Sequence, residues 1–112
     1  MSCKKRMLGA MLVCLSITAC AGEAKVAKDN PAAKELANKN GCMSCHDIGS
    51  KIIGPSFVQI AEKYKGQADA SAVLVKKVKE GGKGVWGRIP MPANENVPEK
   101  DLSTMVGWIL AQ

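Results

Sequence analysis

The pentapeptide Cys42-Met43-Ser44-Cys45-His46 constrains this chain more than any other segment. Two thiols in a Cys-x-x-Cys spacing, followed at once by an imidazole, form the signal for covalent attachment of haem. The spacing has a physical reason, because the thiols can reach the two vinyl groups on one porphyrin edge while the next residue presents its ring to the iron. His46 is the only histidine of the chain, so no other protein imidazole can take that place.

The same Cys-x-x-Cys spacing also occurs in thiol redox sites, in zinc sites and in disulfides of an oxidising compartment. A redox Cys-x-x-Cys is expected beside a βαβ pattern, and no segment of this chain alternates apolar and polar residues as a strand does. The adjacent His46 and a matching segment downstream favour haem over these alternatives.

The first 20 residues have the layout of an export signal. Three basic residues at positions 4–6 precede a mostly apolar stretch over 7–17, which is too short to span a membrane comfortably. Two cleavage sites compete. Ala19-Cys20-Ala21 fits the ordinary signal peptidase with cleavage before Gly22, whereas residues 17–20 resemble a bacterial lipoprotein box with cleavage before an acylated Cys20.

The segment that follows favours the lipoprotein alternative. Residues 21–30 are small and polar, as a flexible tether would be, and a soluble export product would not need such a spacer. More than one acyl chain on Cys20 would hold the protein stably on a membrane. We therefore divide the chain into a cleaved, lipoprotein-like signal peptide (1–20), a tether (21–30) and one folded domain (31–112).

Removal of the signal accounts for the other cysteines and for part of the charge. Cys3 and Cys14 leave with the signal, Cys20 is lipidated or removed, and no thiol beyond Cys42 and Cys45 is left for a disulfide. The formal charge of +6 includes three basic residues of the signal, so the mature chain carries about +3. Such a weak charge with only 4% aromatic residues excludes a nucleic-acid-binding surface, but it suits docking to acidic redox partners.

Apolar periodicity predicts an all-α domain with no sheet. Helices are expected from Asn30-Pro31 to about Asn40, from Pro55 to Gly66, from Asp69 to Glu80 and from Pro98 to Ala111. The third helix should bury Ala70, Val73, Leu74 and Val78, and the last should bury Leu102, Met105, Val106, Ile109 and Leu110, with Trp108 on its flank. A chain of this size buries little surface, so a haem would complete its core.

The long Gly- and Pro-rich loop at residues 82–94 supplies a candidate for the second iron ligand. Met91 lies between two prolines, which fix φ and make a stiff extended segment suited to holding a thioether against a metal. Met43 lies between the two cysteines, and Met105 fits the apolar stripe of the last helix. Met91 is therefore read as a ligand rather than as a core-filling methionine. With His46 it would fill both axial positions, which favours electron transfer over catalysis.

Taken in order, five segments resemble the small bacterial class I cytochromes c of the cytochrome c-551 (c8) type. They are Gly41–His46, Gly54-Pro55, Gly84-Val85-Trp86-Gly87, Ile89-Pro90-Met91-Pro92 and Trp108-Ile109-Leu110. The resemblance covers about residues 30–112. It implies a single-domain fold of about four helices wrapped around one haem c, attached covalently through two thioethers.

The resemblance also implies roles for four residues around the haem. The Pro55 carbonyl would accept the ring N–H of the axial His46 and so orient the ligand. Trp86 and Lys77 would each donate to a haem propionate, although an Arg is usual at the second of these positions. Asn94 would hydrogen-bond the sulfur of the methionine ligand and tune the reduction potential.

Together these features predict a monomeric, periplasmic electron carrier and not an enzyme. It would pass single electrons from a membrane cytochrome donor to a terminal reductase, oxidase or peroxidase, and it would touch the membrane only through a lipid anchor on Cys20. Three alternatives stay open: a haem-based ligand sensor, a small haem enzyme with a displaceable Met91, and a dedicated electron-transfer subunit of one reductase.

Overall fold

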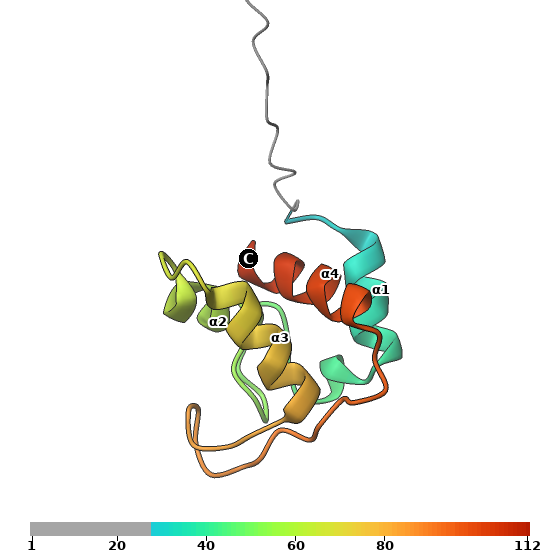
Figure 1. Cartoon of the computed structure of the whole chain (residues 1–112). Helices are drawn as coiled ribbons and strands as arrows, with labels where there is room; N and C mark the ends of the chain where they lie inside the picture. Colours follow the sequence, from blue (N-terminus) through green and yellow to red (C-terminus); the bar gives the residue numbers. More distant parts are fainter. Residues whose placement is uncertain (1–27) are drawn as a thin grey trace, which may run out of the picture.

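A computed structural model describes residues 28–112, so the predicted signal peptide and most of the predicted tether lie outside the described residues. Its elements are α1 (Pro31–Lys39), the short 3-10 helix η1 (Cys42–Ser44), α2 (Phe57–Tyr64), α3 (Ala70–Glu80) and α4 (Glu99–Leu110). Within residues 28–112 the β-type pairing is confined to one isolated antiparallel bridge between Gly82 and Met91. The predicted all-α fold with four helices is confirmed (Figure 1).

Side-chain caps decide where the first two helices begin. The side chain of Asn30 accepts a hydrogen bond from the backbone N–H of Ala33 at 3.1 Å and caps α1. Helix α2 begins after the expected Pro55, because Ser56 forms a capping box with Gln59. The Ser56 hydroxyl accepts from the Gln59 backbone N–H at 3.1 Å, and the Gln59 side chain accepts from the Ser56 N–H at 3.0 Å.

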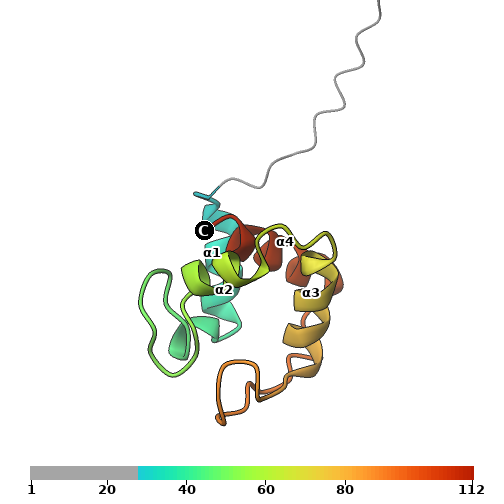
Figure 2. The ribbon, with the colours of Figure 1, turned by 90° about the vertical axis from the view of Figure 1, so that its left-hand side faces the viewer.

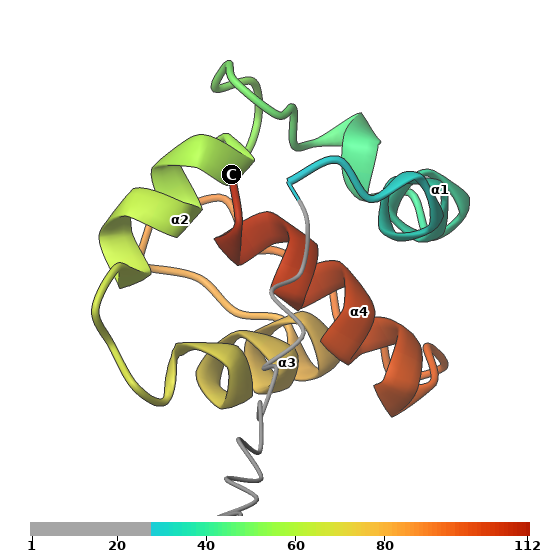
Figure 3. The same ribbon diagram turned by 90° about the horizontal axis from the view of Figure 1, so that it is seen from above.

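Helix α4 is the centre of the domain and contacts α1, α2 and α3 (Figure 3). Its predicted core face is buried at Leu102, Met105, Val106 and Ile109. The prediction that Trp108 lies on the flank is wrong, because this side chain is only 2% exposed. Since helices pack on several sides of α4, its apolar surface is wider than one stripe. Leu110 is half-buried at the end of the helix.

The helices around α4 bury narrower faces. Ala33 and Ala37 of α1 are both fully buried, and their small side chains allow this helix to lie close to α4. In α3, Ala70 and Leu74 are buried and Val78 is half-buried, so the buried stripe follows an i, i+4 spacing. The prediction that Val73 is buried is wrong: it lies off that stripe and is 37% exposed.

The first described residues, which the sequence assigned to the tether, contact the end of α4. The indole Nε1 of Trp108 donates to the Lys28 carbonyl at 2.9 Å, and the side-chain amide of Gln112 donates to the same oxygen at 3.1 Å. In Figure 1 the C-terminus and residue 28 lie at the top, whereas the loop between α3 and α4 lies at the bottom. Within residues 28–112 no helix has the length and hydropathy that a membrane span requires.

Candidate haem-binding site

One tight turn carries the Cys-x-x-Cys-His motif. Gly41, at φ +75°, joins α1 to η1 in the left-handed region that favours glycine. The backbone N–H groups of Cys45 and His46 both donate to the Cys42 carbonyl, at 3.2 and 2.9 Å. This turn brings the two thiols to one cavity, and neither of them is in a disulfide. Burial raises the pKa of the Cys42 thiol.

The loop of residues 47–55 folds back onto the motif. The N–H of Gly54 donates to the Cys45 carbonyl at 2.7 Å, and the N–H of Phe57 donates to the Asp47 carbonyl at 3.0 Å. The Asp47 carboxylate accepts hydrogen bonds from two backbone N–H groups of the same loop, which hold its pKa below the ordinary value. The end of the loop is therefore held directly beside the histidine.

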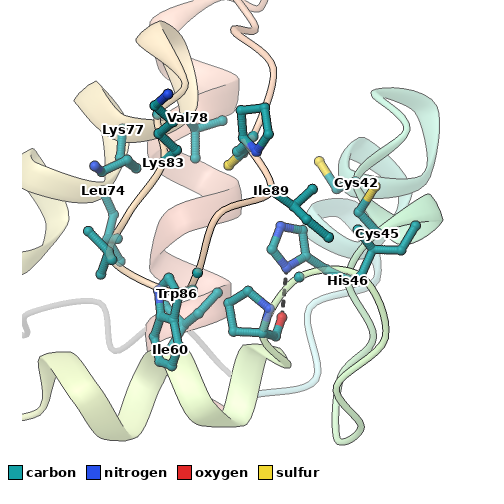
Figure 4. Close-up of a pocket in the computed structure, with 18 of the residues that line it drawn as sticks. Cys42, Cys45, His46, Ile60, Leu74, Lys77, Val78, Lys83, Trp86 and Ile89 are labelled. Atoms are coloured by element: carbon teal, nitrogen blue, oxygen red, sulfur yellow. Dashed lines mark hydrogen bonds between the residues drawn. The ribbon is translucent and has the colours of Figure 1, made fainter.

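Three residues lie against the His46 ring and fix its orientation. Its Nδ1 lies 2.7 Å from the Pro55 carbonyl oxygen, the contact that the resemblance implies (Figure 4). Because a carbonyl can only accept, Nδ1 carries the proton and Nε2 keeps a free lone pair for a metal. The ring stacks on Phe57 at a centroid distance of 5.5 Å, and Phe57 meets Trp108 edge-on at 5.3 Å. Gly54 closes the other side, where a Cβ would lie 2.6 Å from Cε1 of the ring.

Met91 lies at the base of the methionine loop, which we define as residues 82–92. The N–H of Gly82 donates to the Met91 carbonyl at 3.1 Å, and the N–H of Met91 donates to the Gly82 carbonyl at 2.8 Å. Gly81 has φ +72°, and a Cβ there would lie 2.5 Å from the Met91 carbonyl oxygen, so the close approach requires glycine. Met91 is half-buried and lines the same cavity as His46.

Asn94 ties the end of this loop to the last turn of α3. Its backbone N–H donates to the carbonyls of Val78 and Lys79, both at 3.1 Å. Its side-chain Nδ2 donates to the carbonyls of Val78 and Pro92, both at 3.2 Å. Asn94 does not line the cavity. The expected hydrogen bond from Asn94 to the Met91 sulfur stays a prediction.

A cavity of about 590 Å³ lies between the motif and the methionine loop. Figure 4 shows Cys42, Cys45 and His46 on one side of it and Leu74 and Val78 of α3 on the other. Figure 2 shows how α2, α3 and the methionine loop, which all contribute residues to the lining, are arranged. Most of the cavity lining is apolar, and the cavity volume falls within the roughly 300–1,000 Å³ of ordinary cofactor cavities. Helices α2, α3 and α4 contribute Phe57, Ile60, Tyr64, Leu74, Val78, Met105, Val106 and Ile109.

The charged side chains at the cavity are all basic. Lys51, Lys77, Lys83 and Arg88 line it, and no Asp or Glu of residues 28–112 does. The Lys77 ammonium extends over the start of the methionine loop, where a Cβ at Gly82 would lie 3.2 Å from Nζ. This cluster of cations in a low-dielectric wall would stabilise bound anionic groups.

Trp86 lies at the tip of the methionine loop and also lines the cavity. It is 40% exposed, and the Nζ of Lys63 in α2 lies 5.5 Å from the centroid of its ring. Seven of the eight site residues expected from the sequence thus line one cavity, and Asn94 is the exception. Sequence reasoning gave no role to Gly54, Phe57 or Lys63. A glycine directly before the expected Pro55 was the available signal for the first of them.

The residues of this cavity fit a haem. Two unpaired thiols, a histidine with a free Nε2 and a methionine thioether converge on an apolar space with a basic rim. The same residues do not fit a zinc site, which takes about four protein ligands. Within the described part of the chain, no group of three or more His, Cys, Asp or Glu side chains could hold a metal ion.

Comparison with known proteins gives a consistent result. The cytochrome c family model matches residues 31–112. Cytochrome c-552 of Nitrosomonas europaea is 46% identical over 76 residues, which cover 68% of this chain and 74% of that protein. Cytochrome c-551 of Allochromatium vinosum is 48% identical over 75 residues, covering 67% and 80% of the two chains.

Solved structures agree with these relatives. The crystal structure of wild-type Nitrosomonas europaea cytochrome c552 superposes with a TM-score of 0.67 at 45% identity, covering 69% of this chain and 95% of that one. The class 1 cytochrome MtoD of Sideroxydans lithotrophicus ES-1 superposes with a TM-score of 0.63 at 38% identity, covering 75% and 96%.

Proposed function

The chain belongs to the cytochrome c family, and we propose that it works in the periplasm as a one-electron carrier between a membrane cytochrome donor and a terminal acceptor. Membership implies one covalently attached haem c and a role in electron transfer. The location, the partners and the roles of individual residues are the proposal. The bound haem would supply the one-electron chemistry, and the chain would anchor, orient and shield it.

The proposal assigns four residues to the haem itself. Cys42 and Cys45 form the thioethers, and Nε2 of His46 and the sulfur of Met91 hold the iron from its two faces. One observation carries this assignment: the Pro55 carbonyl engages Nδ1 of His46 at 2.7 Å and leaves Nε2 free in a cavity that Met91 also lines. If His46 and Met91 both hold the iron, they would leave no position open for oxygen or peroxide.

Four further residues surround the ligands and complete the site. Pro55 orients His46 through its carbonyl, and such partners typically matter nearly as much as the ligands themselves. Trp86 and Lys77 line the cavity, where they would donate hydrogen bonds to the propionates of a bound haem. Asn94 tunes the methionine ligand. Asn94 can affect the ligand in two ways: by contact with the Met91 sulfur, and by anchoring the loop through its hydrogen bonds to α3.

The basic cavity rim supports docking to an acidic partner. Lys51, Lys77, Lys83 and Arg88 line the cavity, where no carboxylate of residues 28–112 lies. Such a rim raises the association rate more than the affinity, and redox encounters bury little area. Electron-transfer rates with an acidic partner should therefore fall as salt shortens the Debye length from about 30 Å at 0.01 M to about 8 Å at 0.15 M. A flat rate over that range would count against this docking mode.

Optical spectra of the haem-loaded protein test the ligand assignment. Sharp α and β bands when reduced, a far-red sulfur-to-iron band when oxidised and no response to carbon monoxide support a carrier with His46 and Met91 as ligands. The matched variant Met91→Ala should lose the far-red band and bind carbon monoxide. Ready carbon monoxide binding by the unaltered protein would contradict the carrier function and support a ligand sensor or a haem enzyme.

The N-terminal processing needs its own experiment, because the cleavage sites lie outside the described residues. The favoured alternative is cleavage before Cys20 and acylation of its thiol, which would restrict the carrier to the membrane surface. The intact mass of the mature protein separates this from cleavage before Gly22. A separate question is whether the protein is a free carrier or a dedicated subunit of one reductase. Cosedimentation with one purified reductase would support the dedicated subunit.

A further inference from the structure

We propose that Lys63 is a positioning residue that holds the tip of the methionine loop against α2 through a cation–π contact with Trp86. Lys63 lies in the last turn of α2, and its Nζ is 5.5 Å from the centroid of the Trp86 ring. An ammonium within about 6 Å of an indole centroid is attracted by the ring quadrupole, and Trp gives the strongest such contact. The pair therefore joins two walls of the cavity.

The two ends of the methionine loop differ in how they are held. Its base is fixed by the paired hydrogen bonds between Gly82 and Met91 and by the anchoring of Asn94 to α3. The tip holds itself in a turn, in which the Gly84 N–H donates to the Gly87 carbonyl at 2.9 Å. Both partners of that hydrogen bond lie within the tip, so it does not attach the tip to a helix. The Lys63–Trp86 contact attaches the tip to α2.

The tip has the properties of a segment that needs such a contact. Val85, Trp86 and Ile89 line the cavity, and none of them belongs to the hydrophobic core that the helices form or packs against it. Gly84 and Gly87 have φ of +97° and +130°, and the freedom of glycine makes them natural hinges. Segments with few buried contacts open at low free-energy cost. A single tie between tip and helix can then change the open population measurably.

The inference rests on the proposed function in one respect: with Met91 as an iron ligand, a small ligand that replaces its sulfur needs room on the methionine-loop side of the cavity, and opening of the tip would supply that room. Lys63 would then oppose displacement of the methionine without touching the haem or the iron. An exposed cation–π pair is worth enough to change an opening equilibrium about two- to fivefold.

The test is a titration of the oxidised, haem-loaded protein with imidazole, followed by the loss of the far-red sulfur-to-iron band. Lys63→Gln should bind imidazole about two- to fivefold more tightly than the unaltered protein. Lys63→Arg keeps a cation over the ring and should restore the original affinity. Lys65→Gln is the matched control, because it removes the same charge from an exposed position at the end of the same helix. Equal affinities for Lys63→Gln and Lys65→Gln would overturn the claim that this contact opposes displacement of the methionine.

A second measurement keeps the inference separate from the proposed function. Hydrogen–deuterium exchange of the peptide that contains residues 83–90 reports tip opening whether or not Met91 binds the iron. Faster exchange in Lys63→Gln than in Lys65→Gln supports the contact, even if the far-red band is absent and the methionine ligation fails. Identical exchange in the two variants overturns the contact, even if the band is present.

Discussion

Replacing Gly54 by Ala tests how tightly the protein holds the His46 ring. Gly54 lies outside the left-handed region of φ, so its backbone accepts alanine and the new methyl group acts by contact alone. The added Cβ would lie 2.6 Å from Cε1, 2.9 Å from Nδ1 and 3.2 Å from Nε2 of His46, against 3.4–4 Å for ordinary contact. The ring must therefore shift by close to an ångström or rotate.

The cost of that shift can be worked from the contacts it disturbs. Moving Nδ1 away from the Pro55 carbonyl loses a hydrogen bond worth about 0.5–1.5 kcal/mol. Forcing the ring against Phe57 overpacks the core at a cost of about 1–3 kcal/mol. Alanine recovers about 0.4–1 kcal/mol by restricting the unfolded chain. The net loss in the free energy of unfolding should be about 0.5–4 kcal/mol.

The assay is denaturant unfolding of the haem-loaded protein, followed by both far-ultraviolet circular dichroism and haem absorbance. Gly49→Ala is the matched control, because Gly49 belongs to the same loop, has no positive φ, and has nothing within 4 Å of the added Cβ. It should leave stability unchanged or slightly raised. Equal stabilities for Gly54→Ala and Gly49→Ala would refute the claim that Gly54 is required to accommodate the histidine ring.

Trp108→Phe removes the indole N–H that donates to the Lys28 carbonyl and also part of a buried ring, so it should lower the free energy of unfolding in urea by more than the about 0.5–1.5 kcal/mol of the hydrogen bond alone. Adding Gln112→Ala should not give an additive loss, because both side chains donate to one oxygen; strict additivity would contradict that shared acceptor. Asn94→Ala leaves its backbone hydrogen bonds in place but removes two from its side chain, so the same assay should show a loss of about 1–3 kcal/mol; a loss near zero would exclude loop anchoring by this side chain. The double variant Cys42→Ser/Cys45→Ser cannot attach haem, so the apolar side chains that line the cavity would stay in contact with water. A domain of this size has little other apolar surface to bury, so losing this burial should remove much of its stability. Circular dichroism should show loss of cooperative helix unfolding, and a native-like transition would contradict this reasoning.

The helices and most of the site residues could be read from local sequence signals. These signals act over only a few residues, so the packing of the domain does not change them. They include Asn30 at the start of α1, the apolar spacing of α2 and Gly66 after its end. The Cys-x-x-Cys-His spacing and the Pro-Met-Pro segment carry chemistry in their own residue types. Both were therefore recognisable without knowing where they meet in space.

The errors arose where the answer depends on neighbours far away in the chain. Trp108 could not be placed by periodicity, because its burial depends on Phe57 and on a carbonyl 80 positions earlier. Val73 matches an apolar pattern, yet the packing of α3 on α4 leaves it exposed. The start of α2 moved because a capping box satisfied its free N–H groups after Pro55.

The sequence by itself determined the chemistry of this protein: two thiols and one imidazole at haem-attachment spacing, a thioether held between prolines, and a basic charge balance. Residue type and spacing determine these properties, because the chemical groups involved belong to the chain itself and do not depend on tertiary contacts. Only the tertiary structure decided the orientation of that chemistry. Gly54 leaves room for the His46 ring, Asn94 bonds to α3, and the Lys63 ammonium lies over the Trp86 ring. Each of these contacts joins segments that approach one another only when the helices pack around α4, and packing is a property of the whole domain.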